Sequence, residues 1–322
     1  MSEHATVRHP VAWLPYAAVS VALLGWACGP LFVNSIDASA QAIVLWRTWI
    51  AIPIMVGVAY ATGGRIDWKL LKVAFPAGVC FGLSFITSYE SFRKTSIAAA
   101  TLIPSLQPAL ILLAAGLLFG ERRSRRELML AFVAFVGISA VVLTASAGTT
   151  TLEGNLYAVG NLLVFAAFFL LSKHLRNRDV QAWSLLAAVF LVTAVVVTPW
   201  AVLTGDDLGA IHGVDWVWLL GLVFLSGLMG HGLMTWVHRY LDVTVTSTLT
   251  LANPVLAVIG AWIVFDQTLN GLQLAGIVVT LVALGLLVRG QTRDVQLASE
   301  AAFGNDLLDE VIDPEPPVPV EE

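Results

Sequence analysis

Residues 182–203 read AWSLLAAVFLVTAVVVTPWAVL, an apolar run without a single Asp, Glu, Lys or Arg. About 20 such residues in an α-helix cross the hydrocarbon core of a membrane, which is roughly 30 Å thick. Backbone polar groups without partners are too costly in lipid, so a spanning segment is either a helix or a strand of a closed barrel. The run does not alternate apolar with polar residues, so we predict a transmembrane helix.

Nine further runs of this kind follow one another along the chain, with short breaks that are rich in turn formers. The composition agrees, because 58% of the 322 residues are hydrophobic and only 12% are charged, whereas a soluble domain has about 25% charged residues. We therefore predict an all-α integral membrane protein with ten transmembrane helices. The predicted spans are residues 13–33, 42–61, 71–88, 96–118, 128–146, 155–172, 182–203, 216–237, 244–265 and 271–289.

The basic residues predict the orientation of these spans. With the N-terminus in the cytoplasm, 14 of the 17 Lys and Arg residues lie on the cytoplasmic side, as the positive-inside rule requires. Only Arg93 and Lys94 fall outside, and Arg47 lies within a span. We expect a multi-pass protein of the plasma (cytoplasmic) membrane with both termini cytoplasmic and no cleavable signal peptide. The inside set is Arg8, Arg65, Lys69, Lys72, Arg122, Arg123, Arg125, Arg126, Lys173, Arg176, Arg178, Arg239, Arg289 and Arg293.

A weak internal repeat relates the two halves of the chain. A shift of 146 residues places Pro108 on Pro254 without a gap, and earlier in each half Gln41 matches Gln181 at a slightly different offset. Each half holds five spans, an odd number, so the second copy must be inverted in the bilayer, as in many secondary transporters. The loop at 120–126 holds four arginines, whereas its counterpart holds none. This difference is expected if the two loops lie on opposite sides of the membrane.

The repeat divides the chain into four parts. We expect a short cytoplasmic N-terminal segment, two five-helix repeats and a cytoplasmic tail. The tail is acidic and rich in proline, a composition typical of disordered segments. The four parts are residues 1–12, 13–146, 155–289 and 290–322.

Three stretches carry a resemblance to a known family. They are the segment from Lys94 through Pro108 to Glu121, the pair Gly25-Trp26 in the first span, and Arg47 in the second. Together they resemble the EamA family of the drug/metabolite transporter superfamily, over roughly residues 13–289. The second half departs from the family pattern in the loop at 266–267, where Asp-Gln replaces the usual Gly-Glu. The resemblance implies two inverted five-helix repeats around a central cavity, through which small metabolites move, often outward.

Amide–proline pairs in the middle of spans four and nine are candidates for a binding site. Gln107-Pro108 and Asn253-Pro254 occupy equivalent positions of the repeat. Each proline frees a backbone carbonyl, and each amide offers donors and an acceptor at membrane depth. Simple kinks held by hydrogen bonds between helices are the alternative. Because Pro104 precedes Pro108 by one turn, we assign Pro104, Pro108 and Pro254 to gating.

Ionisable groups in the spans are expensive in lipid and therefore informative. Arg47 either reaches the outer headgroups or braces a neighbouring helix, or else it serves as a gate or as an anchor for a substrate carboxylate. Tyr89 and Glu90 end span three at the same level, so we assign them to an outer gate, in which Glu90 could pair with Arg47. His231 either is a hydrogen-bonded structural residue or contacts substrate or a proton. His238 is its only histidine neighbour, and two such residues without a third ligand do not predict a metal site.

Trp26, Asn161 and Trp236 complete the predicted binding set. Trp26 lies deep in its span, Asn161 either joins helices or binds substrate, and Trp236 offers an aromatic wall. Gly78 and Gly82, four residues apart in span three, predict a face of close helix packing. No cofactor or metal is expected, since the two cysteines have no metal-type spacing.

The sequence favours a transporter over an enzyme, a receptor or a scaffold. It contains no H-E-x-x-H, no G-x-S-x-G, no nucleotide-binding G-x-x-x-x-G-K-[ST] and no folded extramembrane domain,. We expect a secondary transporter that exports small polar metabolites such as amino acids by alternating access. Amphipathic drugs or toxins, sugars and nucleosides are alternative substrates. The expected partners are the small-molecule substrate and the lipid bilayer, not nucleic acid, and no feature sets the oligomeric state or the coupling ion.

Overall fold

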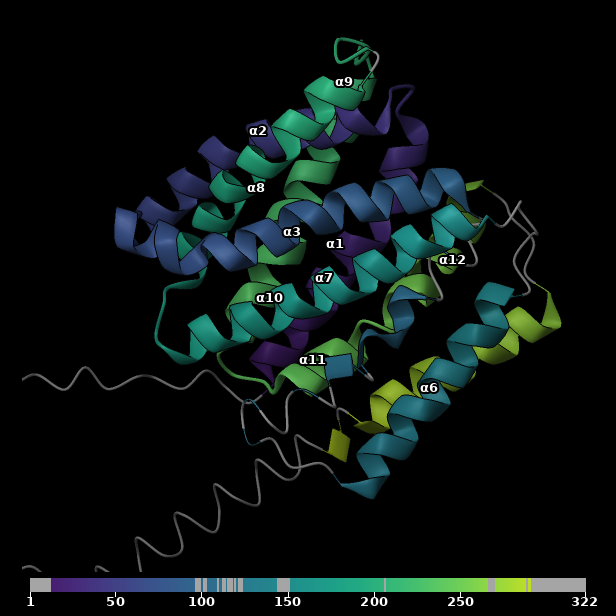
Figure 1. Cartoon of the computed structure of the whole chain (residues 1–322). Coiled ribbons are helices and arrows are strands. Elements are labelled where there is room, and N and C mark those ends of the chain that lie inside the picture. The colour runs from purple at the N-terminus through teal and green to yellow at the C-terminus, as the bar shows by residue number, and fades with distance from the viewer. Residues whose placement is uncertain are drawn as a thin grey trace, which may run out of the picture.

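The computed structural model describes residues 13–95, 100, 103–108, 110, 111, 114, 118, 120, 124–143, 151–205, 207–265, 270–287, 289 and 290. This part of the chain is helical and contains no strand (Figure 1). Six of the described helices are long and apolar enough to cross a membrane. Span four, the loops at 121–123 and 266–269, both ends of the chain and most of the tail lie wholly or largely outside the described residues, so the ten-helix architecture stays a prediction.

The elements follow the predicted spans closely. Helices α3 and α7 extend beyond their predictions at both ends, and span eight is built from three consecutive helical segments. A last apolar helix covers Gly271–Leu287. The other elements are α1 (Leu14–Ser35), α2 (Ala40–Ala61), α3 (Trp68–Lys94), η1 (Pro104–Leu106), α6 (Arg125–Leu143), α7 (Leu152–Asn177), α8 (Ala182–Thr204), α9 (Asp215–Gly221), η2 (Leu222–His231), α10 (Gly232–Val237), α11 (Val243–Leu249) and α12 (Ala252–Phe265).

Side-chain caps fix where four of the long helices begin. Ser39 caps α2, Asp67 caps α3, Thr151 caps α7 and Gln181 caps α8, each by accepting a hydrogen bond from a backbone N–H of the first turn. The first N–H groups of a helix have no partner within the helix, so these side chains satisfy donors that would otherwise be exposed at the membrane interface.

Span nine is broken, although one continuous helix was predicted over 244–265. Helix α11 ends at Leu249 and α12 begins at Ala252, and between them Leu251 N–H donates to Thr248 O in a tighter turn. Pro254 lies in the first turn of α12, where its missing N–H costs no helical hydrogen bond. The 3₁₀ turn η1 precedes Pro108 in the same way. The two breaks therefore fall at equivalent positions of the repeat.

Helices α2 and α8 lie antiparallel along their whole length (Figure 1). At one end Gln41 Nε2 donates to Thr204 Oγ1 at 3.5 Å, and at the other Gln181 Nε2 donates to Thr62 Oγ1 at 2.7 Å. Because Gln41 and Gln181 are matched residues of the repeat, each half makes the same contact with the other half. Reciprocal contacts of this kind are expected if the two halves are related by a two-fold axis, as the predicted repeat requires.

A second reciprocal pair is formed by α6 and the helix Gly271–Leu287, which lie side by side in Figure 1. Thr280 Oγ1 donates to Ala134 O at 3.3 Å, and the two residues are 146 positions apart, which is the repeat shift itself. A Cβ at Gly137 would lie only 2.4 Å from Thr280 Oγ1. The two helices thus cross at residues that are each other's counterparts.

Helix α3 packs tightly on α8 at the two glycines of span three. A Cβ at Gly78 would lie 2.5 Å from Val192 Cβ, and one at Gly82 would lie 2.9 Å from Val196 Cβ. Thr193 Oγ1 also donates to Gly78 O at 3.2 Å. The prediction of a close-packing face is confirmed, and the face lies within the bundle.

Large apolar side chains cover the outside of the bundle. Leu203 is 83% exposed, Leu152 76% and Trp68 70%. A soluble protein rarely exposes so much contiguous apolar surface, and in a bilayer the same surface contacts lipid.

Replacing Gly78 by Ala should destabilise the fold, because the new methyl group would overlap the Val192 side chain. Overpacking of this kind costs about 1–3 kcal/mol. Gly57→Ala is the matched control, since a Cβ there meets nothing within 4 Å and a helical Ala is favoured over Gly by up to about 1 kcal/mol. Thermal unfolding of the purified protein in detergent should show a lower midpoint for Gly78→Ala alone. Equal midpoints would contradict the tight α3–α8 contact.

Candidate functional site

A cavity of about 370 Å³ lies between α1, α2, α3, α7, η2 and the start of α12. It is within the size range of small-molecule sites, which is about 300–1,000 Å³. The cavity lies toward one end of the bundle. At this end α1 and α3 finish and α2 and α7 begin, and we call it the open end. Its lining residues are Trp26, Gly29, Val33, Arg47, Ser84, Phe85, Ser88, Tyr89, Asn161, Phe165, Leu222, Ser226, His231 and Asn253.

Five of the seven predicted binding residues share this cavity. Trp26, Arg47, Asn161, His231 and Asn253 come from five different elements, yet all line it. Tyr89, which was predicted as a gating residue, lines it too. Folding thus assembles most of the predicted set into one site.

Arg47 provides the full positive charge of the cavity wall. It is only 5% exposed, its Nη1 donates to Tyr89 Oη at 3.1 Å, and its guanidinium carbon lies 4.4 Å from the centre of the Phe85 ring. The pair with Glu90 that the sequence allowed does not form, because Glu90 is bonded to Lys94 at 3.4 Å. Among the described residues that line the cavity there is no Asp or Glu. The contacts of Arg47 among the described residues are therefore with neutral groups.

Aromatic rings surround His231 at the inner end of the cavity. Its ring centroid lies 4.9 Å from that of Trp26 and 4.7 Å from that of Phe81. His231 Nδ1, Trp26 Nε1 and Asn253 Oδ1 are buried and have no hydrogen-bond partner among the described residues. Buried polar atoms normally have partners, so these three atoms are left without their usual hydrogen bonds in this conformation.

The π-helix η2 shapes one wall of the cavity. It carries Leu222, Ser226 and His231, and it packs so closely on α1 that a Cβ at Gly25 would lie 2.4 Å from Leu225 O. Helices of this type are rare and occur frequently at functional sites. No pattern in the sequence predicted this segment.

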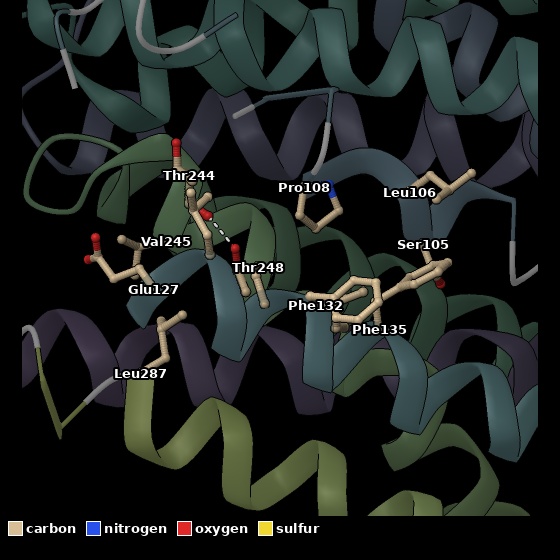
Figure 2. A pocket seen from close by; sticks show the side chains of 13 residues that line it. Ser105, Leu106, Pro108, Glu127, Phe132, Phe135, Thr244, Val245, Thr248 and Leu287 are labelled. Atoms are coloured by element: carbon tan, nitrogen blue, oxygen red, sulfur yellow. Dashed lines mark hydrogen bonds between the residues drawn. The ribbon is translucent and has the colours of Figure 1, made fainter. Parts of the chain in front are cut away.

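Two predicted binding residues lie elsewhere. Gln107 is buried at the end of η1 and does not line the cavity, although its Nε2 also has no partner among the described residues. The two predicted midplane amides therefore lie in different surroundings: Asn253 lines the cavity, and Gln107 does not. Trp236 packs on Tyr240, with 4.6 Å between ring centroids. Pro108 lines a second, apolar cavity (Figure 2).

Several residues that line the cavity were not predicted from the sequence. Ser84, Ser88 and Ser226 are small and common in transmembrane helices, so nothing distinguished them. Phe85, however, is the counterpart of His231 under the 146-residue shift, and the two rings lie 6.4 Å apart. Applying the repeat to His231 would have identified Phe85.

Basic residues of α7 close the opposite end of the bundle. Lys173 and Arg176 are each only 6% exposed, although both were predicted as cytoplasmic loop residues. Lys173 Nζ donates to Leu241 O at 2.8 Å, and Arg176 Nε donates to Thr235 O at 3.1 Å. Two cations are therefore used to satisfy backbone carbonyls at the end of span eight.

An ion pair extends this closure toward the surface. Arg239 Nη2 lies 2.5 Å from Asp179 Oδ1, and Arg239 Nη1 donates to Arg176 O at 3.2 Å. Asp179 has a φ of 61°, a conformation that Asp and Asn tolerate better than most residues. We call Lys173, Arg176, Asp179 and Arg239 the α7 clasp.

At the rim of the open end, Lys94 ties α3 to α7. Its Nζ lies 2.5 Å from Glu153 Oε1 and 3.4 Å from Glu90 Oε2. The Glu153 carboxylate raises the pKa of the Lys94 ammonium. Thr95 Oγ1 and Asn155 Oδ1 are hydrogen-bonded nearby at 2.8 Å. The rim is thus joined on the α3–α7 side.

Comparisons with known proteins agree with this architecture. The sequence profile of the EamA-like transporter family matches residues 13–143 and 152–289. An uncharacterized transporter from Archaeoglobus fulgidus is 22% identical over 247 residues, which is 76% of this chain and 86% of that protein. One solved crystal structure shares the fold with a TM-score of 0.74, at 17% identity over 87% of this chain and 99% of that chain.

A cysteine at Ser88 should report access to the cavity. In a protein with Cys28 and Cys80 replaced by Ala, Ser88→Cys in detergent should react with a water-soluble maleimide about tenfold faster than Ser172→Cys, because thiol reactivity follows exposure. Ser88 lines the cavity, whereas Ser172 is 0% exposed. Labelling is measured by mass spectrometry. Equal rates would mean that water does not reach this cavity.

Proposed function

We propose that this chain, which belongs to the EamA-like transporter family and is a multi-pass membrane transporter, is a secondary transporter of small polar or zwitterionic metabolites such as amino acids. The substrate binds in the cavity lined by Arg47 and His231 and moves outward by alternating access. Trp26, Asn161 and Asn253 complete the binding set. Gln107 and Trp236 do not line the cavity in this conformation, and a contact of either residue with the substrate stays a prediction.

The observation that carries this proposal is a buried cation, Arg47, in a cavity whose described lining residues include no acid. Arg47 is fixed by Tyr89 and Phe85, which leaves donors of its guanidinium for a substrate. Guanidinium groups bind carboxylates through charge-assisted, often bidentate hydrogen bonds, and poor screening in a buried site strengthens the attraction. A substrate carboxylate is therefore the natural counterion.

The rest of the wall suits the other parts of an amino acid. The amide of Asn161 can accept from an ammonium group, and the faces of Trp26 and Phe165 can attract the same cation or pack against an apolar side chain. Asn161 lines the same cavity as Arg47. An amphipathic drug would use the aromatic walls and depend less on Arg47, which distinguishes this alternative.

Alternating access is supported by the contrast between the two ends of the bundle. Under the 146-residue shift, Thr235, which is bound by the α7 clasp, corresponds to Tyr89, which lines the cavity. Matched positions are therefore closed at one end and open at the other. Exchanging the conformations of two inverted repeats would open the clasped end and close the other.

The basic residues favour a cytoplasmic location for the clasped end, because Lys173, Arg176 and Arg239 of the α7 clasp belong to the predicted inside set. The cavity then faces outward in this structure, and both termini lie in the cytoplasm. The breaks at Pro104, Pro108 and Pro254 provide points at which spans four and nine can bend during the exchange. Tyr89 and Glu90 lie where an outer gate would close.

Arg47→Gln should weaken transport of carboxylate substrates. We expect the KM for the best amino acid to rise about tenfold or more, since removing one partner of a buried charged hydrogen bond costs roughly 1.5–3 kcal/mol. Arg47→Lys should restore part of the loss. Uptake and efflux of a labelled amino-acid panel are measured in proteoliposomes, with and without a pH gradient.

Arg178→Gln is the matched control, because Arg178 is exposed on the surface and its loss should leave the KM unchanged. Wild-type kinetics for Arg47→Gln would refute the carboxylate contact. Movement of sugars or amphipathic cations, but of no amino acid, would replace the substrate class and keep the transporter. A response to the pH gradient would establish proton coupling.

Asp179→Asn should shift the equilibrium away from the outward-facing state. The substitution keeps the backbone conformation tolerable and removes the ion pair to Arg239. Such a pair contributes up to about 1 kcal/mol at the surface, so labelling of Ser88→Cys by an impermeant maleimide in liposomes should slow by up to about fivefold. Arg178→Gln again serves as control. Faster labelling would contradict a clasp at the cytoplasmic end.

A further inference from the structure

The second cavity lies apart from the proposed substrate site. It has a volume of about 410 Å³ and is bordered by η1, α6, α11 and the helix Gly271–Leu287 (Figure 2). Its wall is almost entirely apolar and includes Phe132, Phe135 and Leu251. None of the described residues lines both this cavity and the first one. A polar metabolite would find almost no hydrogen-bond partner here.

This cavity is open to lipid along α6. Phe132 is 66% exposed, Leu106 42% and Leu128 38%, whereas Leu251 and Leu287 are only 2% and 3% exposed. The exposed residues therefore form its edges and the buried ones its floor. We call it the α6 groove.

The α6 groove has the length of one membrane leaflet. Along α6 its lining runs from Glu127 to Phe135, which is about 12 Å at 1.5 Å per residue. Half of a hydrocarbon core of roughly 30 Å is about 15 Å. In Figure 2, Glu127 and Leu287 lie at one end of the groove and Leu106 and Ser105 at the other. A straight acyl chain from one leaflet fits this extent.

Positive charge gathers where a lipid headgroup would lie. Arg125, Arg126 and Arg289 are exposed at the Glu127 end, and Arg126 Nη1 would lie 2.9 Å from a Cβ at Gly290. The Glu127 carboxylate is occupied in a helix cap, accepting from Ser124 N at 2.9 Å. Three cations thus face the interface next to one capped acid.

We propose that the α6 groove binds one acyl chain of an anionic phospholipid, with its phosphate on Arg125, Arg126 and Arg289. The apolar wall selects hydrocarbon, the leaflet length selects a membrane lipid, and the cations select an anionic headgroup. The far end of the chain would lie against Pro108 and Leu251, beside the breaks in spans four and nine. A bound lipid is thereby placed to favour one conformation of both broken helices.

Native mass spectrometry of the full chain tests this site. The protein is exchanged from detergent into mixed micelles with phosphatidylglycerol or phosphatidylcholine of identical acyl chains. We expect phosphatidylglycerol to be retained about fivefold more than phosphatidylcholine, and the preference to disappear in Arg125→Gln/Arg126→Gln. Equal retention of both lipids by the wild type, or no retention, would overturn the proposal.

Ala131→Phe tests the groove itself, because Ala131 lines it and a phenyl ring would fill it. Retention of phosphatidylglycerol should fall at least about fivefold. Val133→Phe is the control: Val133 is on the same helix, 39% exposed and outside the lining. Thermal midpoints verify that both variants are folded. Unchanged retention in Ala131→Phe would refute an acyl-chain site.

Discussion

In the hydrocarbon core of a membrane, every backbone N–H and C=O must find a partner within the protein. Unbroken helices meet this requirement without help, and most of the described chain consists of them. Departures from the regular helix therefore need shelter or compensation. The break between α11 and α12 uses 3₁₀-type bonds, and the carbonyls of Thr235 and Leu241 are satisfied by cations of α7. The irregular backbone lies where two helical segments meet or where a side chain of another helix supplies the hydrogen bond.

The same need to pair buried polar groups explains how charge is distributed in the bundle. Lys173 and Arg176 donate to carbonyls, and Arg239 pairs with Asp179. The cations at the clasped end therefore already bind groups of the protein. Arg47 differs, because a phenol and a phenyl ring hold it without neutralising it. A cation that is positioned but not neutralised can bind an anionic group, and this contrast separates the proposed substrate site from the closed end.

Several packing contacts follow the repeat predicted from the sequence, whereas the lining of the cavity departs from it. The contacts of Gln41 and Gln181, and the crossing of Ala134 with Thr280, follow the repeat closely. The cavity does not. Phe85 in one half is matched by His231 in the other, and they meet in the wall of one cavity. The two halves can share their packing contacts and still differ in the cavity. Packing depends mainly on the sizes of the side chains, whereas the chemistry of the lining depends on which residue stands at each position.

The sequence by itself determined the membrane class, most helix boundaries and five residues of the cavity, because apolar length, cap residues and polar groups at membrane depth are local properties. Arg47, Asn161 and Asn253 were identifiable because lipid makes each of them costly. Only the tertiary structure decided that Asn253 enters the cavity and Gln107 does not, that Lys173 and Arg176 turn inward to carbonyls, and that η2 winds as a π-helix. These outcomes depend on which helix faces which, and that is set by packing between residues far apart in the chain.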